Sequence, residues 1–325
     1  MGKPTALGEF GRIAKFFAPL AAGQPGALDL LDDAALVECP PGERLVVTVD
    51  AMVEGVHFLS DDPPDLIARK LVRVNLSDLA AMAARPVGYF LTTALPKSRG
   101  DDWLARFADG LAQDQAEFGI ALLGGDSVST PGPVSLTLTA FGRVAPGAEV
   151  RRSGARPGDL VFVSGTIGDG AFGLEAARGQ LDERLDPAEV AYLADRYRLP
   201  RPRVALGPRL SGLASAMMDV SDGLAGDLGH ICAASSVAGV IEAARVPLSP
   251  AAARLGRLEL ALTGGDDYEL LFTASRAQQD AILAAAAAAG VPVTPIGRIE
   301  AGQGVQVLDA AGQTMALAGV GWRHF

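Results

Sequence analysis

Aspartates occupy unusual places in this sequence, beside apolar runs rather than on polar surfaces. Asp50 ends the run Leu-Val-Val-Thr-Val, Asp219 follows Ala-Met-Met, and Asp78 lies inside an apolar helical stretch. Any one of them taken alone fits a helix cap or a turn. Taken together they predict a site for divalent cations, because hard cations such as Mg²⁺ bind carboxylate oxygens and share them with substrate phosphates.

The segment Asp219-Val-Ser-Asp222-Gly223 is the sharpest local signal. Two carboxylates flank a hydroxyl where a strand ends and a helix begins. An EF-hand is excluded, because its glycine belongs at the sixth loop position and its bidentate glutamate at the twelfth. The alternative interpretation is a helix N-cap formed by Ser221 or Asp222.

Two other patterns imitate known nucleotide or hydrolase sites. The run Gly168-Asp-Gly170-Ala-Phe-Gly173 resembles a dinucleotide-binding turn, but no apolar strand follows to present a ribose-binding acid. We interpret it as a glycine-rich turn whose backbone packs closely, and one form of this interpretation places the turn near a phosphate. Gly125-Asp126-Ser127 with Asp227 and His230 imitates a serine hydrolase in the wrong chain order. No P-loop motif occurs in the sequence.

Aromatic side chains near these aspartates have open roles. His57 lies on a glycine-broken loop shortly after Asp50, where contact with a substrate and a structural role are balanced alternatives. Phe118 precedes the Leu-Gly-Gly-Asp126 segment and either packs in the core or stacks on a base. His230 fits a helix face, and His324 fits an exposed tail.

Composition excludes several classes of protein. The chain has 325 residues, and 28 Lys and Arg against 38 Asp and Glu give a net charge of −10. This charge argues against a protein that mainly binds nucleic acid or anionic membranes. No targeting or membrane-spanning segment is expected. Two cysteines and three histidines favour neither a disulfide framework nor a zinc cluster, so we expect a reduced, cytoplasmic protein.

Alternating helical and strand patterns predict the elements that position these residues. Strands are expected at 45–49, 87–95, 120–123, 134–144, 160–164, 217–220, 268–273 and 292–299. Helices are expected at 64–84, 101–118, 224–234 and 276–289, after Gly168 and after Pro202, with an opening helix through Leu20 and a final hairpin around Gly312. Pro- and Gly-rich segments near 145–158 indicate a linker. The fold class is therefore α/β (α+β) with two domains, 1–147 and 148–325.

At this point the motifs are similar to those of a known family. The chain resembles the thiamine-monophosphate kinases of the aminoimidazole-ribonucleotide-synthetase-like superfamily. The matching stretches run in family order across essentially the whole chain: Gly8-Glu-Phe10, Asp32-Asp-Ala34, Thr48-Val-Asp50, Val53-Glu-Gly-Val-His-Phe58, Asn75-Leu-Ser-Asp-Leu-Ala-Ala-Met82, Gly124-Gly-Asp126, Arg152-Ser-Gly154, Gly165 to Gly173, Asp219-Val-Ser-Asp-Gly223 and Gly264-Gly-Asp-Asp-Tyr-Glu269.

The resemblance implies ATP-dependent phosphorylation of thiamine monophosphate, several Mg²⁺ ions, a homodimer formed through the N-terminal sheet, and an active site between the domains. The implied Mg²⁺ ligands are Asp33, Thr48, Asp50, Asp78, Asp126, Asp219 and Asp222. The implied ATP contacts are Gly125, Asp126, Arg152 and Ser221, with Phe118 beside the base. The implied contacts to thiamine phosphate are His57, Asp266 and Trp322. Within this set, Asp219, Asp222 and Arg152 are the expected catalytic residues.

The sequence departs from the family pattern in a few places. Leu30 and Leu31 replace the usual glycines before the Asp32–Asp33 pair, Ser127 stands where Thr is common, and Phe118 where Tyr is frequent. Two alternatives remain: another enzyme of the superfamily, and a non-catalytic nucleotide-binding module. Selenophosphate synthetase is disfavoured, because no cysteine lies near Lys3 or Lys15. Loss of metal ligands would be expected in a module, and here the carboxylate set is intact.

Overall fold

Two compact units make up the chain. The computed structural model describes residues 8–32, 34–181, 184–317, 319 and 321. The first unit comprises Met1–Leu79 with Arg85–Pro146, and the second comprises Ala80–Ala84 with Gly147–Phe325. The predicted two-domain α/β class is confirmed. Among the described residues, no helix has both the length and the apolar character needed to cross a bilayer.

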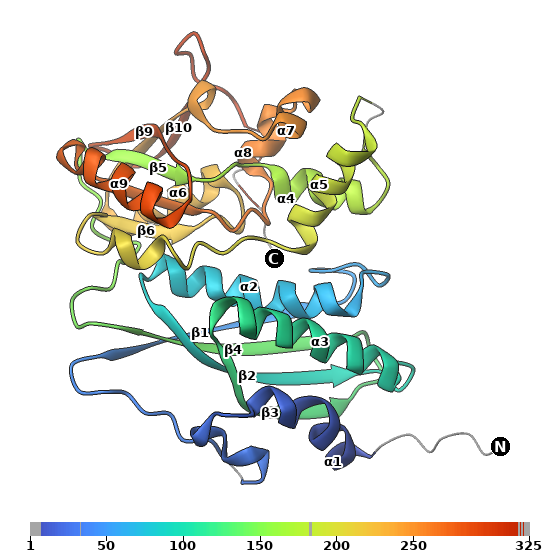
Figure 1. The fold of residues 1–325 in the computed structure, drawn as a ribbon. Helices are drawn as coiled ribbons and strands as arrows, with labels where there is room; N and C mark the ends of the chain where they lie inside the picture. Colours follow the sequence, from blue (N-terminus) through green and yellow to red (C-terminus); the bar gives the residue numbers. More distant parts are fainter. Residues whose placement is uncertain (1–7, 33, 182–183, 318, 320, 322–325) are drawn as a thin grey trace. The chain divides into compact units, whose positions relative to one another are not determined.

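The first unit is a four-stranded sheet with two long helices on one face (Figure 1). Its elements are α1 (Glu9–Arg12), β1 (Arg44–Val53), α2 (Pro64–Ala81), β2 (Arg85–Leu95), α3 (Asp101–Phe118), β3 (Ala121–Ser129) and β4 (Ser135–Val144). The strand order is β1-β4-β2-β3, and only β2 and β3 are parallel neighbours. Short helical turns (Ile13–Phe17, Ala18–Ala21 and Pro25–Leu30) connect α1 to β1.

Strand alternation decides which side chains of this sheet are buried. In β4, Leu136, Leu138 and Ala140 are completely buried on the helix side, while the residues between them are half-buried. In β1 the other face is open, and the apolar side chains of Leu45, Val47 and Val49 are exposed. The sheet therefore has one face in the core, and its other face is open along β1 in this chain.

The second unit contains a six-stranded sheet in the order β10-β7-β9-β5-β8-β6, with only β10 and β7 parallel. Its strands are β5 (Leu160–Ser164), β6 (Ala216–Asp219), β7 (Ala238–Glu242), β8 (Leu270–Ala274), β9 (Val293–Glu300) and β10 (Gly304–Leu308). Its helices are α4 (Asp169–Ala177), α5 (Pro187–Arg198), α6 (Leu224–Ser235), α7 (Pro250–Leu255), α8 (Leu258–Thr263) and α9 (Gln279–Ala289).

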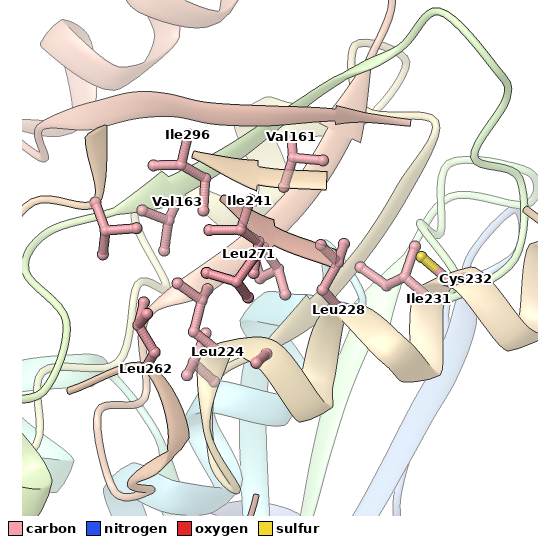
Figure 2. Packing of buried hydrophobic residues seen from close by; sticks show 14 of the residues in the cluster. Val161, Val163, Leu224, Leu228, Ile231, Cys232, Ile241, Leu262, Leu271 and Ile296 are labelled. Atoms are coloured by element: carbon pink, nitrogen blue, oxygen red, sulfur yellow. The ribbon is translucent and has the colours of Figure 1, made fainter. Parts of the chain in front are cut away.

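Both faces of the second sheet are covered. Leu224, Leu228 and Ile231 form one stripe of α6 and pack on Val161, Leu271 and their neighbours (Figure 2). The opposite face carries Phe162 and Phe272, which stack with ring centroids 5.2 Å apart beside Ile282 of α9. Strand β5 is buried at every position, which agrees with the apolar run of its first four residues, 160–163.

Some sequence-based boundaries were wrong. The helix expected after Pro202 is only a short 3₁₀ turn (Gly207–Leu210) in a proline-containing stretch, and α5 lies before it. The capping box of Asp186 and Glu189 with Pro187 marks the start of α5. Strand β3, expected at 120–123, continues to Ser129 because it remains paired with β2 to that end.

Candidate active site

Thr48, Asp50 and Asp78 come together on the helix side of the first sheet. Thr48 and Asp50 are two residues apart in β1 and therefore share a face. Thr48 Oγ1 donates a hydrogen bond of 2.5 Å to Asp78 Oδ2 on α2. Burial, and next the nearby charge of Asp78, raise the pKa of Asp50 to about 6. This pair of carboxylates with a hydroxyl offers hard oxygen donors that a divalent cation would stabilise.

Asp126 lies on the other face of the same sheet. Asp126 pairs with Thr92 on β2, and the same cross-strand row reaches Ala51 on β1. Ala51 follows Asp50 directly in the strand, so the two side chains point to opposite faces of the sheet. Asp126 is exposed and lines a cavity of about 400 Å³ together with Asp32 and Gly125. The first unit thus has two separate carboxylate positions, where the sequence suggested one cluster.

Gly125 lies directly beside the neighbouring strand. A Cβ placed on it would lie 1.9 Å from the carbonyl oxygen of Leu91, so only glycine fits there. Its cavity is also lined by Phe17, Leu30 and Phe90, which supply apolar surface next to the Asp126 carboxylate. A cavity with apolar walls and a few polar groups is typical of a ligand site.

His57 and Phe118 have partners inside the first unit. His57 Nδ1 accepts a hydrogen bond of 3.0 Å from the backbone N–H of Val53, which leaves the proton of a neutral ring on Nε2. The ring of Phe118 has the guanidinium of Arg73 over it, 5.0 Å from the centroid. This contact shows one face of Phe118 in an intramolecular cation–π pair.

In the second unit, the Asp219–Gly223 segment forms the predicted strand-to-helix turn. Asp219 ends β6 and is 3% exposed, whereas Ser221 and Asp222 are partly exposed. Gly223 has φ = 129°, and a Cβ there would lie 2.6 Å from the carbonyl oxygen of Thr263. The close approach explains why a glycine follows the second aspartate.

Residues 264–269 lie against this turn. The backbone N–H of Asp266 donates to Ser221 O (2.9 Å), and that of Tyr268 donates to Val220 O (2.8 Å). Asp266 and Tyr268 have φ values of 70° and 52°, a region that non-glycine residues rarely adopt. The Tyr268 hydroxyl donates to Asp266 Oδ1 at 3.1 Å. Asp266 is therefore adjacent to the Asp219–Gly223 turn.

The glycine-rich turn before α4 is held by the protein itself. The N–H groups of Gly168 and Gly170 donate to the two carboxylate oxygens of Asp267. An internal carboxylate thus occupies the donors that a phosphate would need at this helix N-terminus. The turn packs closely, as expected, and its first N–H groups are already bonded.

The remaining predicted residues are less constrained. Arg152 is exposed, and its carbonyl oxygen accepts a hydrogen bond of 3.4 Å from Ser235. Asp33 and Trp322 lie outside the described residues, as does His324. His230 is exposed while Asp227 is buried beneath the Asp219–Gly223 turn, an arrangement unlike the acid–histidine pair of a hydrolase.

No group of three His, Cys, Asp or Glu side chains within the described part of the chain is arranged to hold a metal ion. The structure instead brings Asp50 close to Asp78 in the first unit, and it brings Asp222 close to Asp227 in the second. Sequence reasoning assigned no role to Asp227, Asp267 and Glu269, which are buried beneath the second-unit turns. Their proximity in sequence to Asp222 and Asp266 was the available signal.

Comparison with known proteins assigns the family. The AIR synthase related protein N-terminal domain matches residues 31–144, and the C-terminal domain matches residues 156–310. A thiamine-monophosphate kinase of Caulobacter vibrioides is 46% identical over 97% of this chain and 90% of its own length.

Solved structures agree with that assignment. The crystal structure of thiamine-monophosphate kinase from Stenotrophomonas maltophilia K279a has a TM-score of 0.80 and 44% identity, covering 88% of this chain and 91% of that one. AaThiL complexed with AMPPCP and TMP has a TM-score of 0.78 and 31% identity, covering 100% and 99% of the two chains. The chain belongs to the thiamine-monophosphate kinase family, and its two halves are AIR-synthase-related domains.

Proposed function

We propose that this chain transfers the γ-phosphoryl group of ATP directly to thiamine monophosphate, giving thiamine diphosphate and ADP. The observation that carries the proposal is the Thr48–Asp50–Asp78 group, a pair of adjacent carboxylates in a family with a member solved with AMPPCP and TMP. A divalent cation would stabilise the ionised form of both carboxylates, and phosphoryl transfer depends mainly on positioning and charge neutralisation.

The residues proposed to hold Mg²⁺ all offer oxygen donors: Asp33, Thr48, Asp50, Asp78, Asp126, Asp219 and Asp222. When bound, Mg²⁺ supplies charge neutralisation and a bridge between phosphate oxygens. The lowered charge repulsion between Asp50 and Asp78 would then favour their ionised forms. Asp126 lies on the opposite face of the sheet from Asp50, so we assign it to the cavity that it lines rather than to the Asp50–Asp78 pair.

The proposed substrate contacts rest on the resemblance of the motifs to those of the family. Gly125 and Phe118 are proposed for the nucleotide, together with Arg152 and Ser221 of the second unit. Arg152 is exposed and free to balance charge on the transferring group. His57, Asp266 and Trp322 are proposed to contact the thiamine phosphate, with His57 presenting its Nε2–H as a donor. The acceptor is a phosphate oxygen that is ionised near neutral pH, so the transfer needs no strong general base.

An assay of ADP release with thiamine monophosphate and Mg²⁺ tests the activity. Isotope-chiral γ-phosphate should give inversion, because a single in-line step has no phosphoenzyme; net retention would rule out direct transfer. ATP binding without any turnover would support a non-catalytic module. Turnover with a different acceptor would support another enzyme of the superfamily.

We also propose a homodimer formed by the open face of the first sheet. Leu45, Val47 and Val49 are 37%, 56% and 60% exposed on edge strand β1. A row of exposed apolar side chains on a sheet edge favours association with another copy. Val47→Arg should convert the dimer to monomer in sedimentation, whereas Leu283→Arg, an equally simple change at an exposed leucine of α9, should leave the dimer intact. A monomeric wild type would refute this proposal.

We place the protein in the cytoplasm, where its two free cysteines, Cys39 and Cys232, would stay reduced. Fractionation of cells that produce the chain tests this location.

A further inference from the structure

Two buried aspartates lie beneath the second-unit turns without a role in the proposed contacts. Asp227 on α6 and Asp267 between Asp266 and Tyr268 are each 1% exposed. Both use their carboxylate oxygens to accept backbone N–H groups at the start of a helix. A buried carboxylate is expensive unless it is hydrogen-bonded, so these bonds account for its presence.

Asp267 connects two segments through both of its oxygens. Oδ2 accepts the N–H of Gly168 at 2.7 Å, and Oδ1 accepts the N–H of Gly170 at 2.9 Å. Its two neighbours in sequence, Asp266 and Tyr268, have positive φ values. Non-glycine residues rarely adopt that region and persist there only where the surroundings hold them. The bonds of Asp267 are such a hold.

Asp227 uses its oxygens differently. Oδ2 alone accepts the N–H groups of Asp222 (3.2 Å) and Gly223 (3.1 Å). Oδ1 is buried and has no hydrogen-bond partner among the described residues. The Asp227 carboxylate lies on α6 and thereby holds the preceding turn, which carries Asp219, Ser221 and Asp222.

Close backbone packing connects the two anchored turns. A Cβ placed on Gly170 would lie 2.3 Å from the carbonyl oxygen of Asp266, and one on Gly265 would lie 2.3 Å from that of Ser221. Asp266 and Tyr268 also donate backbone hydrogen bonds to residues 220–221. Together, these contacts leave little freedom for one turn to move without the other.

We propose that Asp227 and Asp267 are positioning residues for phosphoryl transfer: they hold the backbone of the turns so that Asp219, Asp222 and Asp266 have a fixed arrangement. The inference rests on the proposed function for the role of those three residues. Neither positioning residue reaches solvent, so neither is assigned a contact with substrate.

Asp267 accepts hydrogen bonds through both carboxylate oxygens, whereas Asp227 accepts through one, so substitution by Asn tests the proposal differently at the two positions. Asn keeps one oxygen, so Asp227→Asn retains the acceptor that serves both N–H groups. Asp267→Asn retains one acceptor and turns an NH₂ group toward the other N–H donor. Asp227→Asn should therefore keep kcat/KM within about threefold of the wild type. Asp227→Ala and Asp267→Asn should each lower kcat/KM about a hundredfold, the scale of a misplacement of about 1 Å.

The kinetic constants should separate the two turns. Asp267→Asn should raise KM for thiamine monophosphate because Asp266 is adjacent, whereas Asp227→Ala should lower kcat because Asp219 and Asp222 share its turn. Asp186→Ala is the matched control: Asp186 accepts the N–H groups of Ala188 and Glu189 at the start of α5, but has no proposed site residue beside it. Its kinetic constants should remain those of the wild type.

Amide hydrogen exchange tests the anchoring without any turnover. Exchange should increase at residues 165–170 in Asp267→Asn and at 221–223 in Asp227→Ala, with no increase in Asp227→Asn. Equal impairment of Asp227→Asn and Asp227→Ala, or an Asp267→Asn protein with unchanged exchange and kinetics, would overturn the proposal. An inactive wild type with the expected exchange pattern would instead refute the proposed function and leave the anchoring established.

Discussion

The carboxylates of the first unit lie on regular elements, whereas those of the second unit lie on turns. Asp50 and Asp78 belong to β1 and α2, and the strand and helix periods alone direct them to one face. Asp219, Asp222 and Asp266 lie at a strand end and in turns with positive φ values. A regular element positions a side chain by its own backbone hydrogen bonds, but a turn needs additional partners to hold one conformation.

Buried charges supply those partners in the second unit. Glu269, which is completely buried, accepts hydrogen bonds from Ser164, Arg196 and Arg203 directly after the Asp266–Tyr268 segment. The first unit contains a similar group, in which Asp114 accepts from Arg69 and Arg73 at 2.7 and 2.8 Å. That group joins α2 to α3 and contains none of the residues proposed for the site. The comparison predicts that disrupting the Glu269 group will affect catalysis, whereas disrupting the Asp114 group will affect stability alone.

The largest effect is expected from Asp219→Asn. Removing one fixed ligand charge from a phosphoryl-transfer site should lower turnover by about a thousandfold, the scale of losing one preorganised electrostatic contact. The fold should persist, because the side chain is isosteric. Initial rates at saturating substrates measure the change, and Asp280→Asn on the exposed start of α9 is the control. Near-normal turnover would remove Asp219 from the site.

The next effect concerns the two buried charge groups. Glu269→Gln should lower the free energy of unfolding by about 3–5 kcal/mol, because it leaves buried arginine charge without its nearest carboxylate. Asp114→Asn should lower it by less, because Glu117 still accepts hydrogen bonds from Arg69 and Arg73. Urea unfolding measures this change. Glu269→Gln should also lower kcat in the folded protein, whereas Asp114→Asn should not. Equal loss of activity in both variants at a temperature where both are folded would contradict the distinction between turns and regular elements.

A smaller effect should follow pH in the first unit. Because the folded protein raises the pKa of Asp50 from 3.8 to about 6, it favours the protonated form. The resulting stability is fully present below about pH 4 and is lost as the pH rises through about 6. Without divalent cations, Asp50→Asn should therefore gain thermal stability relative to the wild type between pH 4 and 7. Thermal scans in a chelator test this, and a pH-independent difference would contradict it.

The smallest effect is expected from Tyr268→Phe. This change removes the hydroxyl that donates to Asp266 Oδ1 and leaves the ring. The loss of one hydrogen bond, about 1 kcal/mol, should raise KM for thiamine monophosphate about fivefold with little change in kcat. An unchanged KM would mean that the turn backbone alone positions Asp266. The buried carboxylates that hold this backbone would then matter more than the Tyr268 hydroxyl.

Sequence reasoning predicted the parts of the molecule that follow from periodicity. The helix at 101–118 matches α3, and the alternation at 134–144 predicted β4 within one residue. The sequence placed Thr48 on a strand at 45–49, Asp50 directly after that strand, and Asp78 on a helix. The family was also predicted and is confirmed.

Sequence reasoning missed what depends on long-range packing. Asp227 and Asp267 resemble ordinary helix and turn aspartates, and only their burial beneath distant backbone segments distinguishes them. The placement of Asp126 on the opposite face of the sheet depends on pairing through β2 and β4, which no local pattern encodes. Assignments to particular Mg²⁺ or substrate contacts stay predictions.

The chain path has a consequence for synthesis and dissection of the protein. Residues Ala80–Ala84 belong to the second unit, although more than sixty residues of the first unit follow them. Ala80, Ala81 and Ala83 pack with Val150, Leu206 and Leu210, which the ribosome adds much later. A fragment that ends near residue 147 would carry this apolar stretch without its partners. The N-terminal half expressed by itself should therefore be less soluble than a domain whose residues are all contiguous in sequence.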